Sequence, residues 1–349
     1  MITSERAIKR ARVLEVAVGA GAERVILTSP AAVSWYLGGA RVTVPFGGDA
    51  VVTVAVTAGG DEVRCYSNEI ERLIAEEAVD AAAIPVDWHS PLVPLDWSAD
   101  ALTLHESSLA TELRSARASL LPVELDRYRS LGSDVARMVT AVAAALTPTT
   151  TEMDAAAQLA AGIVAAGAEP VVLLVAGGER TRFRHPVPTR GALGDRAILV
   201  VGARRHGLIV SLTRWITFAP VSAHQREVDA RLLEVEASVF DATRPGRSIA
   251  DVFADLRGAY LEHGFDNHEW QRHHQGGPTG YVGRDPRASE TVTDPIVDWH
   301  AFAWNPSATA AKTEDTVVVS ARGVEVLTVD DAWPTATVRG RERPISLEK

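Results

Sequence analysis

Two short apolar runs joined by a polar turn constrain the fold of this chain more than any other stretch. Residues 197–201 are continuously apolar, as expected for a strand that is buried on both faces. A second apolar run, residues 208–212, follows the glycine-bounded segment Gly-Ala-Arg-Arg-His-Gly at 202–207 and leads into Thr213 and Arg214. This pattern predicts a β-hairpin inside a buried sheet.

The rest of the chain alternates helical and strand patterns. Apolar residues at helical spacing predict helices over residues 4–20, 69–77, 124–146, 153–166, 227–240 and 249–263. Runs of strand-forming residues predict strands over residues 24–27, 51–57, 63–66, 170–175, 316–319, 325–327 and 333–338. Pro122 interrupts the pattern just before the long helix that begins at residue 124. We therefore expect one domain over residues 1–118 and a second over residues 119–349.

Composition narrows the class of protein. The 349 residues are 46% hydrophobic and 23% charged, which permits one large or two medium domains with proper cores and argues against disorder. Asp and Glu number 45 against 35 Lys and Arg, so no basic face for nucleic acid is indicated. Cys65 is the only cysteine, which excludes an internal disulfide framework and a cysteine-based zinc site. Because the sequence shows no signal-peptide pattern and no apolar run of membrane-spanning length, we expect a cytoplasmic protein without a membrane partner.

The hairpin resembles one in the pita-bread family, which includes methionine aminopeptidase, Xaa-Pro aminopeptidase, prolidase and creatinase. The shared residues are Gly202, Gly207, Thr213, Arg214 and the Glu-Asp-Thr phrase at 314–316. Residues 27–39 are similar to the opening of the amino-terminal domains of creatinase and prolidase. The resemblance implies an α+β protein, with a small N-terminal α/β creatinase-like domain followed by a C-terminal pita-bread domain.

The metal ligands of that family are largely missing here. Five family side chains chelate a pair of divalent metals, and the corresponding positions hold Val200, Ser211, Gly277, Asn305 and Glu314. A dinuclear site needs several anionic oxygen or imidazole ligands, and one carboxylate with one amide cannot hold two divalent ions. We therefore expect neither a metal nor another cofactor, and no dinuclear peptidase mechanism.

Two residues are candidates for catalysis within this frame. A family histidine that binds substrate or relays a proton precedes the first aspartate strand, and His185 stands at that position. Its imidazole titrates near neutral pH and suits acid–base work. Glu314 is the family ligand that is retained, and the apolar run after it favours a position in a pocket. A loop histidine packed on a proline and a solvent-facing strand glutamate are the alternative interpretations.

Further positions are candidates for substrate binding. Arg284 replaces a second family histidine, and its planar guanidinium can bind a carboxylate through two hydrogen bonds, the alternative being a solvated arginine paired to the next aspartate. Asn305 and Ser211 keep polar groups at lost ligand positions. His273 and His274 are adjacent, and neighbours on an extended chain point to opposite faces. We therefore expect at most one of them to face the site, and assign His274 while the choice stays open.

These residues lead to three hypotheses. The first is a metal-independent, creatinase-like hydrolase of a C–N bond in a small carboxylate-bearing molecule, with His185 transferring the proton. The second is a non-catalytic pseudo-peptidase that binds a peptide or a small ligand. The third, a metal-dependent Xaa-Pro aminopeptidase, is opposed by the missing ligands. By resemblance we also expect a homodimer, in which Arg41 of one subunit reaches the pocket of the other.

Overall fold

The computed structural model describes residues 2–77, 79 and 82–349, which divide into two compact units. The first unit runs to Val123 and includes the hairpin tip His206–Leu208, whereas the second holds Glu124–Arg205 and Ile209–Lys349. From the sequence we expected the domain boundary after residue 118, whereas the observed first unit continues to Val123. No helix in the described ranges is long and apolar enough to cross a bilayer.

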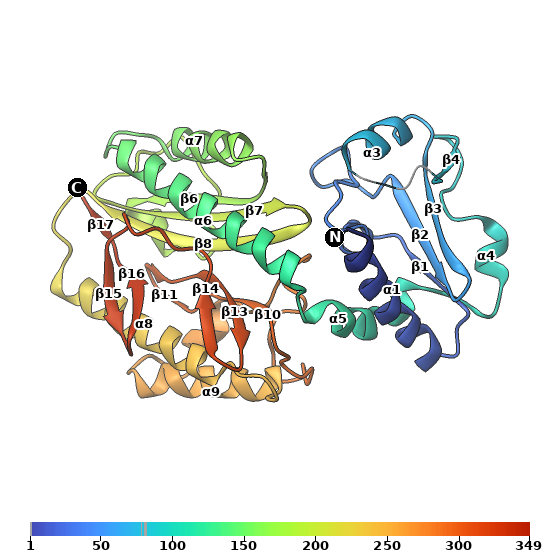
Figure 1. Ribbon diagram of the computed structural model, residues 1–349. Coiled ribbons are helices and arrows are strands. Elements are labelled where there is room, and N and C mark those ends of the chain that lie inside the picture. The colour runs from blue at the N-terminus through green and yellow to red at the C-terminus, as the bar shows by residue number, and fades with distance from the viewer. Residues whose placement is uncertain (1, 78, 80–81) are drawn as a thin grey trace. The chain divides into compact units, whose positions relative to one another are not determined.

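The first unit is built on one mixed sheet. Its strand order is β4-β3-β2-β1-β5, with bounds β1 Arg24–Leu27, β2 Val52–Thr57, β3 Gly60–Tyr66, β4 Ile84–Val86 and β5 Thr103–His105. Strand β1 pairs antiparallel with β2 and parallel with β5, and its last three residues are fully buried. The helices are α1 Ile2–Gly19, α2 Pro30–Tyr36, α3 Ile70–Glu76, α4 Leu95–Ala99 and α5 Ala110–Ala118. The α/β character predicted for this part is confirmed (Figure 1).

The predicted hairpin is the centre of the first sheet of the second unit. Strands β7 Arg196–Arg205 and β8 Leu208–Thr217 are neighbours in a sheet of order β17-β8-β7-β6, with β6 Glu169–Gly177 and β17 Leu347–Glu348 at its edges. The turn residues His206 (φ 51°) and Gly207 (φ 74°) both have positive φ, as a type I′ turn requires. Every residue of β8 is buried. The strands are longer than their apolar cores because polar residues at each end still pair in the ladder.

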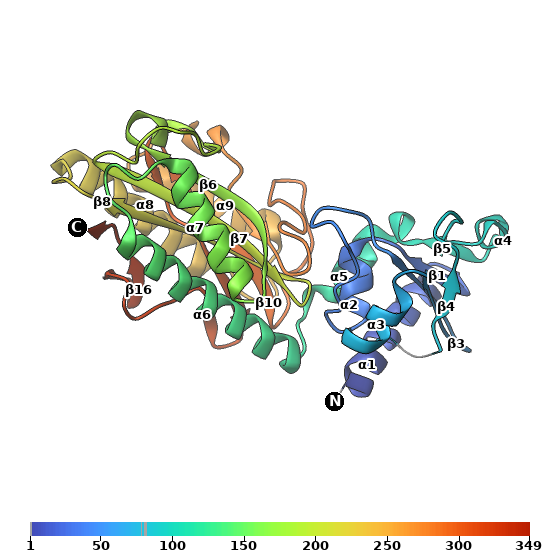
Figure 2. The same ribbon diagram turned by 90° about the horizontal axis from the view of Figure 1, so that it is seen from above.

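Helices cover the outer face of this sheet. Helix α6 Pro122–Ala145 and helix α7 Glu152–Ala165 lie over it side by side (Figures 1 and 2). A Cβ added at Gly162 of α7 would lie 2.5 Å from Met138 of α6, so the two helices approach closely at this glycine. Both helices begin within two residues of their predicted starts, because Pro122 and the N-cap residue Thr151 define these ends.

A second sheet completes the unit. Its order is β14-β13-β10-β9, with bounds β9 Gly276–Pro278, β10 His300–Trp304, β13 Asp315–Ser320 and β14 Gly323–Val326. Helices α8 Ala223–Ala242 and α9 Ile249–Glu262 pack against it around a core that includes Phe240, Tyr260, Phe302 and Trp304 (Figure 1). Two short hairpins accompany it, β11 Ser307–Ala308 with β12 Ala311–Lys312 and β15 Thr335–Val338 with β16 Arg341–Pro344.

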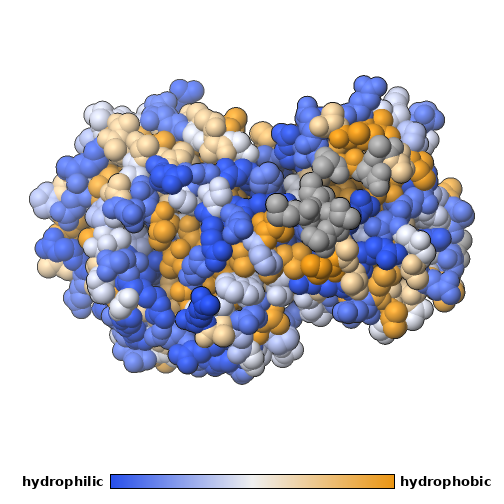
Figure 3. All heavy atoms as spheres, viewed as in Figure 1, coloured by the Kyte–Doolittle hydropathy of each residue, from blue (hydrophilic) through white to orange (hydrophobic). Residues whose placement is uncertain are grey.

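A buried network of charges ties these elements together. Arg343 donates to Glu236 of α8 at 2.6 and 2.8 Å and to Asp315 of β13 at 2.6 Å. Arg214 of β8 donates to the other oxygen of Asp315 at 2.9 Å. Two cations and two anions therefore balance inside the protein, which is the condition under which buried charges are tolerated. This network fixes the start of β13, directly after Glu314. On the face shown in Figure 3, hydrophilic and hydrophobic residues are interspersed over both units.

Candidate active site

A pocket of about 540 Å³ opens within the second unit. One wall is apolar and comes from the first sheet, with Val171, Val172, Leu174, Val200, Val201 and Ile209. The rest of the lining is polar, with His185, Ser211, His274, Arg284, Arg287, Asn305, Lys312 and Glu314. Six of the seven residues singled out in the sequence thus line one pocket. The exception is Arg41, which lies in the first unit and pairs with Glu77 at 2.5 Å.

Glu314 is the only carboxylate in the wall of this pocket, and it is already neutralised. Its Oε1 accepts from Arg284 Nη2 at 2.5 Å, and its Oε2 accepts from Lys312 Nζ at 2.9 Å and from Thr213 Oγ1 at 3.1 Å. The side chain is 2% exposed. Burial alone would raise the pKa of Glu314, but the charges of Lys312 and Arg284 outweigh it and lower the pKa to about 2. Glu314 is therefore an anion at any physiological pH.

Lys312 is a site residue that the sequence analysis missed. It is the last residue of β12, it is 8% exposed, and its ammonium group lies on Glu314. A signal was present, since residues two apart on an extended chain face the same side and Lys312 stands two residues before Glu314. Lys312 is not one of the family's ligand positions, so the family resemblance does not point to it.

Three histidines meet at the mouth of the pocket. Nε2 of His273 and Nε2 of His185 are 3.0 Å apart, and the His273 and His274 rings lie stacked with centroids 4.4 Å apart. Of the adjacent pair, only His274 lines the pocket, whereas His273 is buried and contacts His185. Of the two adjacent histidines, His274 is therefore the one that reaches the pocket. Gln275 Nε2 donates to the carbonyls of His273 and Trp270, which holds this segment in place.

The histidine rings are neutral at physiological pH. Burial, followed by the charge of Lys312, lowers the pKa of His273 to about 2, and burial with the charge of Arg284 lowers the pKa of His274 to about 4. The pKa of His185 is also lowered, first by its partial burial and then by Lys312. A neutral imidazole has a free lone pair, so His185 is in the form that accepts a proton.

The segment that carries His185 is held from two sides. Arg184 donates to Glu269 at 2.5 Å, which ties the segment to the turn before His273. At its other end Glu152, buried at the start of α7, accepts from the backbone of Gly177 at 2.9 Å and of Thr189 at 2.8 Å. Glu152 and Glu269 are thus positioning residues that the sequence analysis did not identify, because their partners are distant along the chain.

The positions assigned to the family's metal ligands do not fit a pair of divalent cations. Val200 has no ligand atom, Ser211 offers only a hydroxyl, and Glu314 is committed to two internal cations. At Gly277, φ is +134°, and an added Cβ would lie 2.7 Å from the backbone nitrogen of Ala288. A histidine is therefore excluded there by backbone conformation as well as by sequence.

The histidine cluster has the spacing of a cation site but not its electrostatics. The candidate ligand atoms of His185, His273 and His274 all lie within 4.8 Å of one another. Lys312, Arg284 and Arg287 line the same pocket, and with Glu314 as the only anion the charge of the lining is three minus one, or +2. The positive charges that lower the histidine pKa values also oppose a metal cation.

Several polar atoms in the wall have no partner among the residues that the structure describes. They are Oδ1 of Asn305, Nε of Arg284 and Nδ1 of His274, and Asn305 is 2% exposed. Each unsatisfied buried polar group costs about 1–3 kcal/mol. A ligand that supplies their partners would recover this free energy, so the wall is arranged for a polar ligand group.

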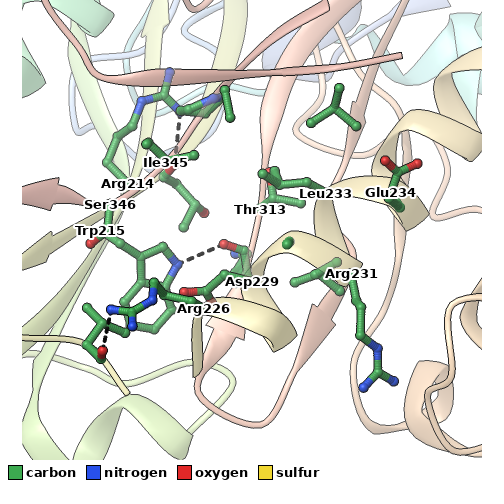
Figure 4. A pocket seen from close by; sticks show the side chains of 18 of the residues that line it. Arg214, Trp215, Arg226, Asp229, Arg231, Leu233, Glu234, Thr313, Ile345 and Ser346 are labelled. Atoms are coloured by element: carbon green, nitrogen blue, oxygen red, sulfur yellow. Dashed lines mark hydrogen bonds between the residues drawn. The ribbon is translucent and has the colours of Figure 1, made fainter. Parts of the chain in front are cut away.

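A second cavity of about 540 Å³ lies between β8, α8 and the β16 region (Figure 4). Arg214, Trp215, Leu233 and Ile345 point toward it in Figure 4. Trp215 Nε1 donates to the carbonyl of Lys312 at 2.8 Å, so Lys312 lies on the wall between the two cavities. None of the sequence-predicted site residues lines this second cavity, and the histidine-lined pocket remains the candidate active site.

Two sheets flanked by paired helices, with the pocket against the hairpin, define the pita-bread class. The chain belongs to the Metallopeptidase family M24, whose model matches residues 126–321, more than half of its length. The recognition made from the hairpin is thereby confirmed, and so is the fold class.

Solved structures show the same fold over the whole chain. Dipeptidase PepE from Mycobacterium ulcerans is 20% identical with a TM-score of 0.78, covering 100% of both chains. The prolidase from Pyrococcus horikoshii OT3 is 16% identical with a TM-score of 0.74, covering 93% of this chain and 98% of its own. The X-Pro aminopeptidase from Thermotoga maritima MSB8 is 15% identical with a TM-score of 0.73, covering 94% and 98%. A search of curated protein sequences found no match.

Proposed function

We propose that this member of the M24 family is a metal-independent hydrolase that cleaves a C–N bond in a small, carboxylate-bearing molecule. The observation that supports it best is the pair of ion contacts on Glu314. Lys312 and Arg284 are fixed cations at the one carboxylate that the family's ligand set retains here. They supply positive charge for a developing oxyanion without a bound ion, which is the electrostatic part of acyl-transfer catalysis.

His185 is the proposed proton-transfer residue. It would take a proton from the attacking water as the oxygen bonds to the carbon of the scissile C–N bond. It would then return that proton to the nitrogen as the bond breaks, so that the products are an acid and an amine. His273 positions the ring, since one of the two facing Nε2 atoms must donate to the other. Glu314 acts by holding Lys312 and Arg284, and Asn305 orients the substrate.

A second candidate is a non-catalytic binding protein. It is favoured by the state of Glu314, whose oxygens are occupied by three donors and are not free to act as a base. His185 is then the group on which turnover depends. The two candidates agree on the ligand and differ only in whether it is consumed.

The test is a screen of small acids and amides by thermal shift, followed by product analysis with the ligands that bind. In the hydrolase, His185→Ala and His185→Gln should fold and bind but lose about 10²–10⁴-fold in rate. Because the pKa of His185 is lowered, the hydrolysis rate of the wild type should fall only when the pH drops below the usual pKa range of a histidine. His224→Ala, an exposed histidine on α8 outside the pocket, is the control. Full turnover by His185→Ala would refute the assignment, and binding without turnover by the wild type would favour the binding protein.

A further inference from the structure

We propose that Arg287 binds the ligand carboxylate, and that the pocket selects an acid whose nitrogen is uncharged, such as an N-acylated amino acid, over one with a free ammonium group. The inference rests on the proposed function where it concerns the reaction, whereas the choice of ligand can be tested by binding measurements alone. It concerns the charge and shape of the pocket in the second unit.

The lining of this pocket leaves no anion for an ammonium group. Glu314 is the only acidic side chain in the lining, and Arg284, Lys312 and Thr213 already donate to its two oxygens. The remaining charge of the lining is positive, and the histidines are neutral. A free ammonium group would therefore enter a positive pocket without an anionic partner, whereas a carboxylate would be attracted.

The two arginines of the lining differ in how many of their donors are already engaged. Arg284 already uses Nη2 on Glu314 and Nη1 on the carbonyl of Gly283, and only its Nε is unpartnered. Arg287 lines the same pocket, is exposed, and has no ion pair or hydrogen bond among the described residues. A planar guanidinium with all its donors available is the group that binds a carboxylate through two hydrogen bonds. The carboxylate-binding role predicted for Arg284 is therefore assigned to Arg287 instead.

Part of the pocket lining is apolar and exposed. Val171 and Val172 of β6 are 43% and 40% exposed, although they are strand residues that face the pocket. Leu174 and Ile209 continue this apolar surface. A ligand with an apolar body would cover it while its polar amide reaches Asn305, whose Oδ1 is buried and unpartnered. An acid, an amide and an apolar group together describe an N-acylated apolar amino acid.

The experiment compares four ligands that differ only in their charged ends, measured by calorimetry with the intact chain. They are N-acetyl-L-leucine, N-acetyl-L-leucinamide, L-leucine and L-leucinamide. We expect N-acetyl-L-leucine to bind at least tenfold more tightly than each of the other three. Equal or tighter binding of L-leucine or L-leucinamide would overturn the selection against an ammonium group, and failure of all four to bind at millimolar concentration would overturn the proposal as a whole.

Two variants test the role of Arg287. Arg287→Gln should weaken N-acetyl-L-leucine at least tenfold and leave N-acetyl-L-leucinamide nearly unchanged, because only the former carries the carboxylate. Arg182→Gln removes an arginine that is 61% exposed and does not line the pocket, and should change neither. Unchanged binding of N-acetyl-L-leucine to Arg287→Gln would refute the assignment. Binding of N-acetyl-L-leucine without its hydrolysis would count against the proposed reaction and leave this inference standing, so the two fail separately.

Discussion

At the scale of single residues, the role of each charged side chain in the site depends on the partner with which it forms an ion pair. Glu314 occupies the position of a family metal ligand, yet its partners are a lysine and an arginine. The same carboxylate that would bind a cation in solution here serves to anchor two internal cations. The identity of a residue at a family position therefore does not give its role, because the role depends on the partners.

Glu314→Gln should destabilise the fold, because it leaves Lys312 and Arg284 without their counter-charge. Removing one partner of a buried pair costs about 3–5 kcal/mol, and urea unfolding at pH 7 measures it. The pKa of Glu314 falls from 4.5 to about 2 in the folded state, so its stabilising effect is present above pH 4.5 and is lost as the pH falls toward 2.

The difference between wild type and Glu314→Gln should accordingly shrink over that acid range. Glu179→Gln, in which the replaced side chain is 96% exposed, is the control and should change stability by less than about 0.5 kcal/mol. A Glu314→Gln protein as stable as the wild type at pH 7 would show that the ion pairs do not form.

At the scale of elements, the polar wall depends on irregular chain between the strands of the second sheet. Strand β9 is Gly-Gly-Pro and pairs closely with β10. A Cβ added at Gly276 would lie 2.1 Å from the carbonyl oxygen of Ala303. Glycine is required for this approach. The close pairing places the segment with Arg284 and Arg287 beside the pocket.

Gly277→His tests whether the family's metal site can be restored at this element. We expect it to lower stability by at least about 1–3 kcal/mol, since φ is +134° and the added Cβ would clash with the backbone of Ala288 and Pro286. Thermal unfolding and elemental analysis of the purified variant measure both consequences. Gly283→Ala, which meets nothing within 4 Å and has no positive φ, is the control. A stable Gly277→His protein that gains a metal would contradict this account.

At the scale of the whole molecule, the pocket is positive although the protein is acidic. The net charge is −10, while the pocket lining carries three cations and one anion. Cationic groups concentrated in one concave site attract anionic ligands to that site in preference to the rest of the surface.

Purified protein should therefore contain no stoichiometric manganese, cobalt or zinc after dialysis. The reason is the lack of free anionic ligands together with the positive lining. Elemental analysis gives the answer directly, and chelators should not reduce any activity. About one metal per chain would contradict the prediction, and its loss in His273→Ala would then place that metal at the histidine cluster.

The homodimer remains a prediction from the family resemblance. Light scattering should give twice the chain mass of 37.3 kDa at micromolar concentration. If Arg41 reaches a partner's pocket, Arg41→Ala should weaken ligand binding, whereas Arg72→Ala, which removes another arginine of the same Glu77 cluster, should not. A monomer mass would remove this idea.

The sequence by itself determined the hairpin, the long helices and the family, and it identified six residues that line one pocket. Periodic burial is a local property, so the strands and helices that show it can be predicted from their own residues. The same reading failed for β9, because Gly-Gly-Pro has no strand propensity and is paired only through its neighbour β10.

Only the tertiary structure decided which groups in the pocket are paired and which are free. Arg284 and Glu314 are 30 residues apart, and His185 and His273 are 88 apart, so no local pattern shows that they meet. The protonation state of each side chain follows from these contacts, since burial and neighbouring charge set its pKa. The fold thereby ties Glu314 to two cations, keeps the histidines neutral and leaves Arg287 without a partner among the residues that the structure describes.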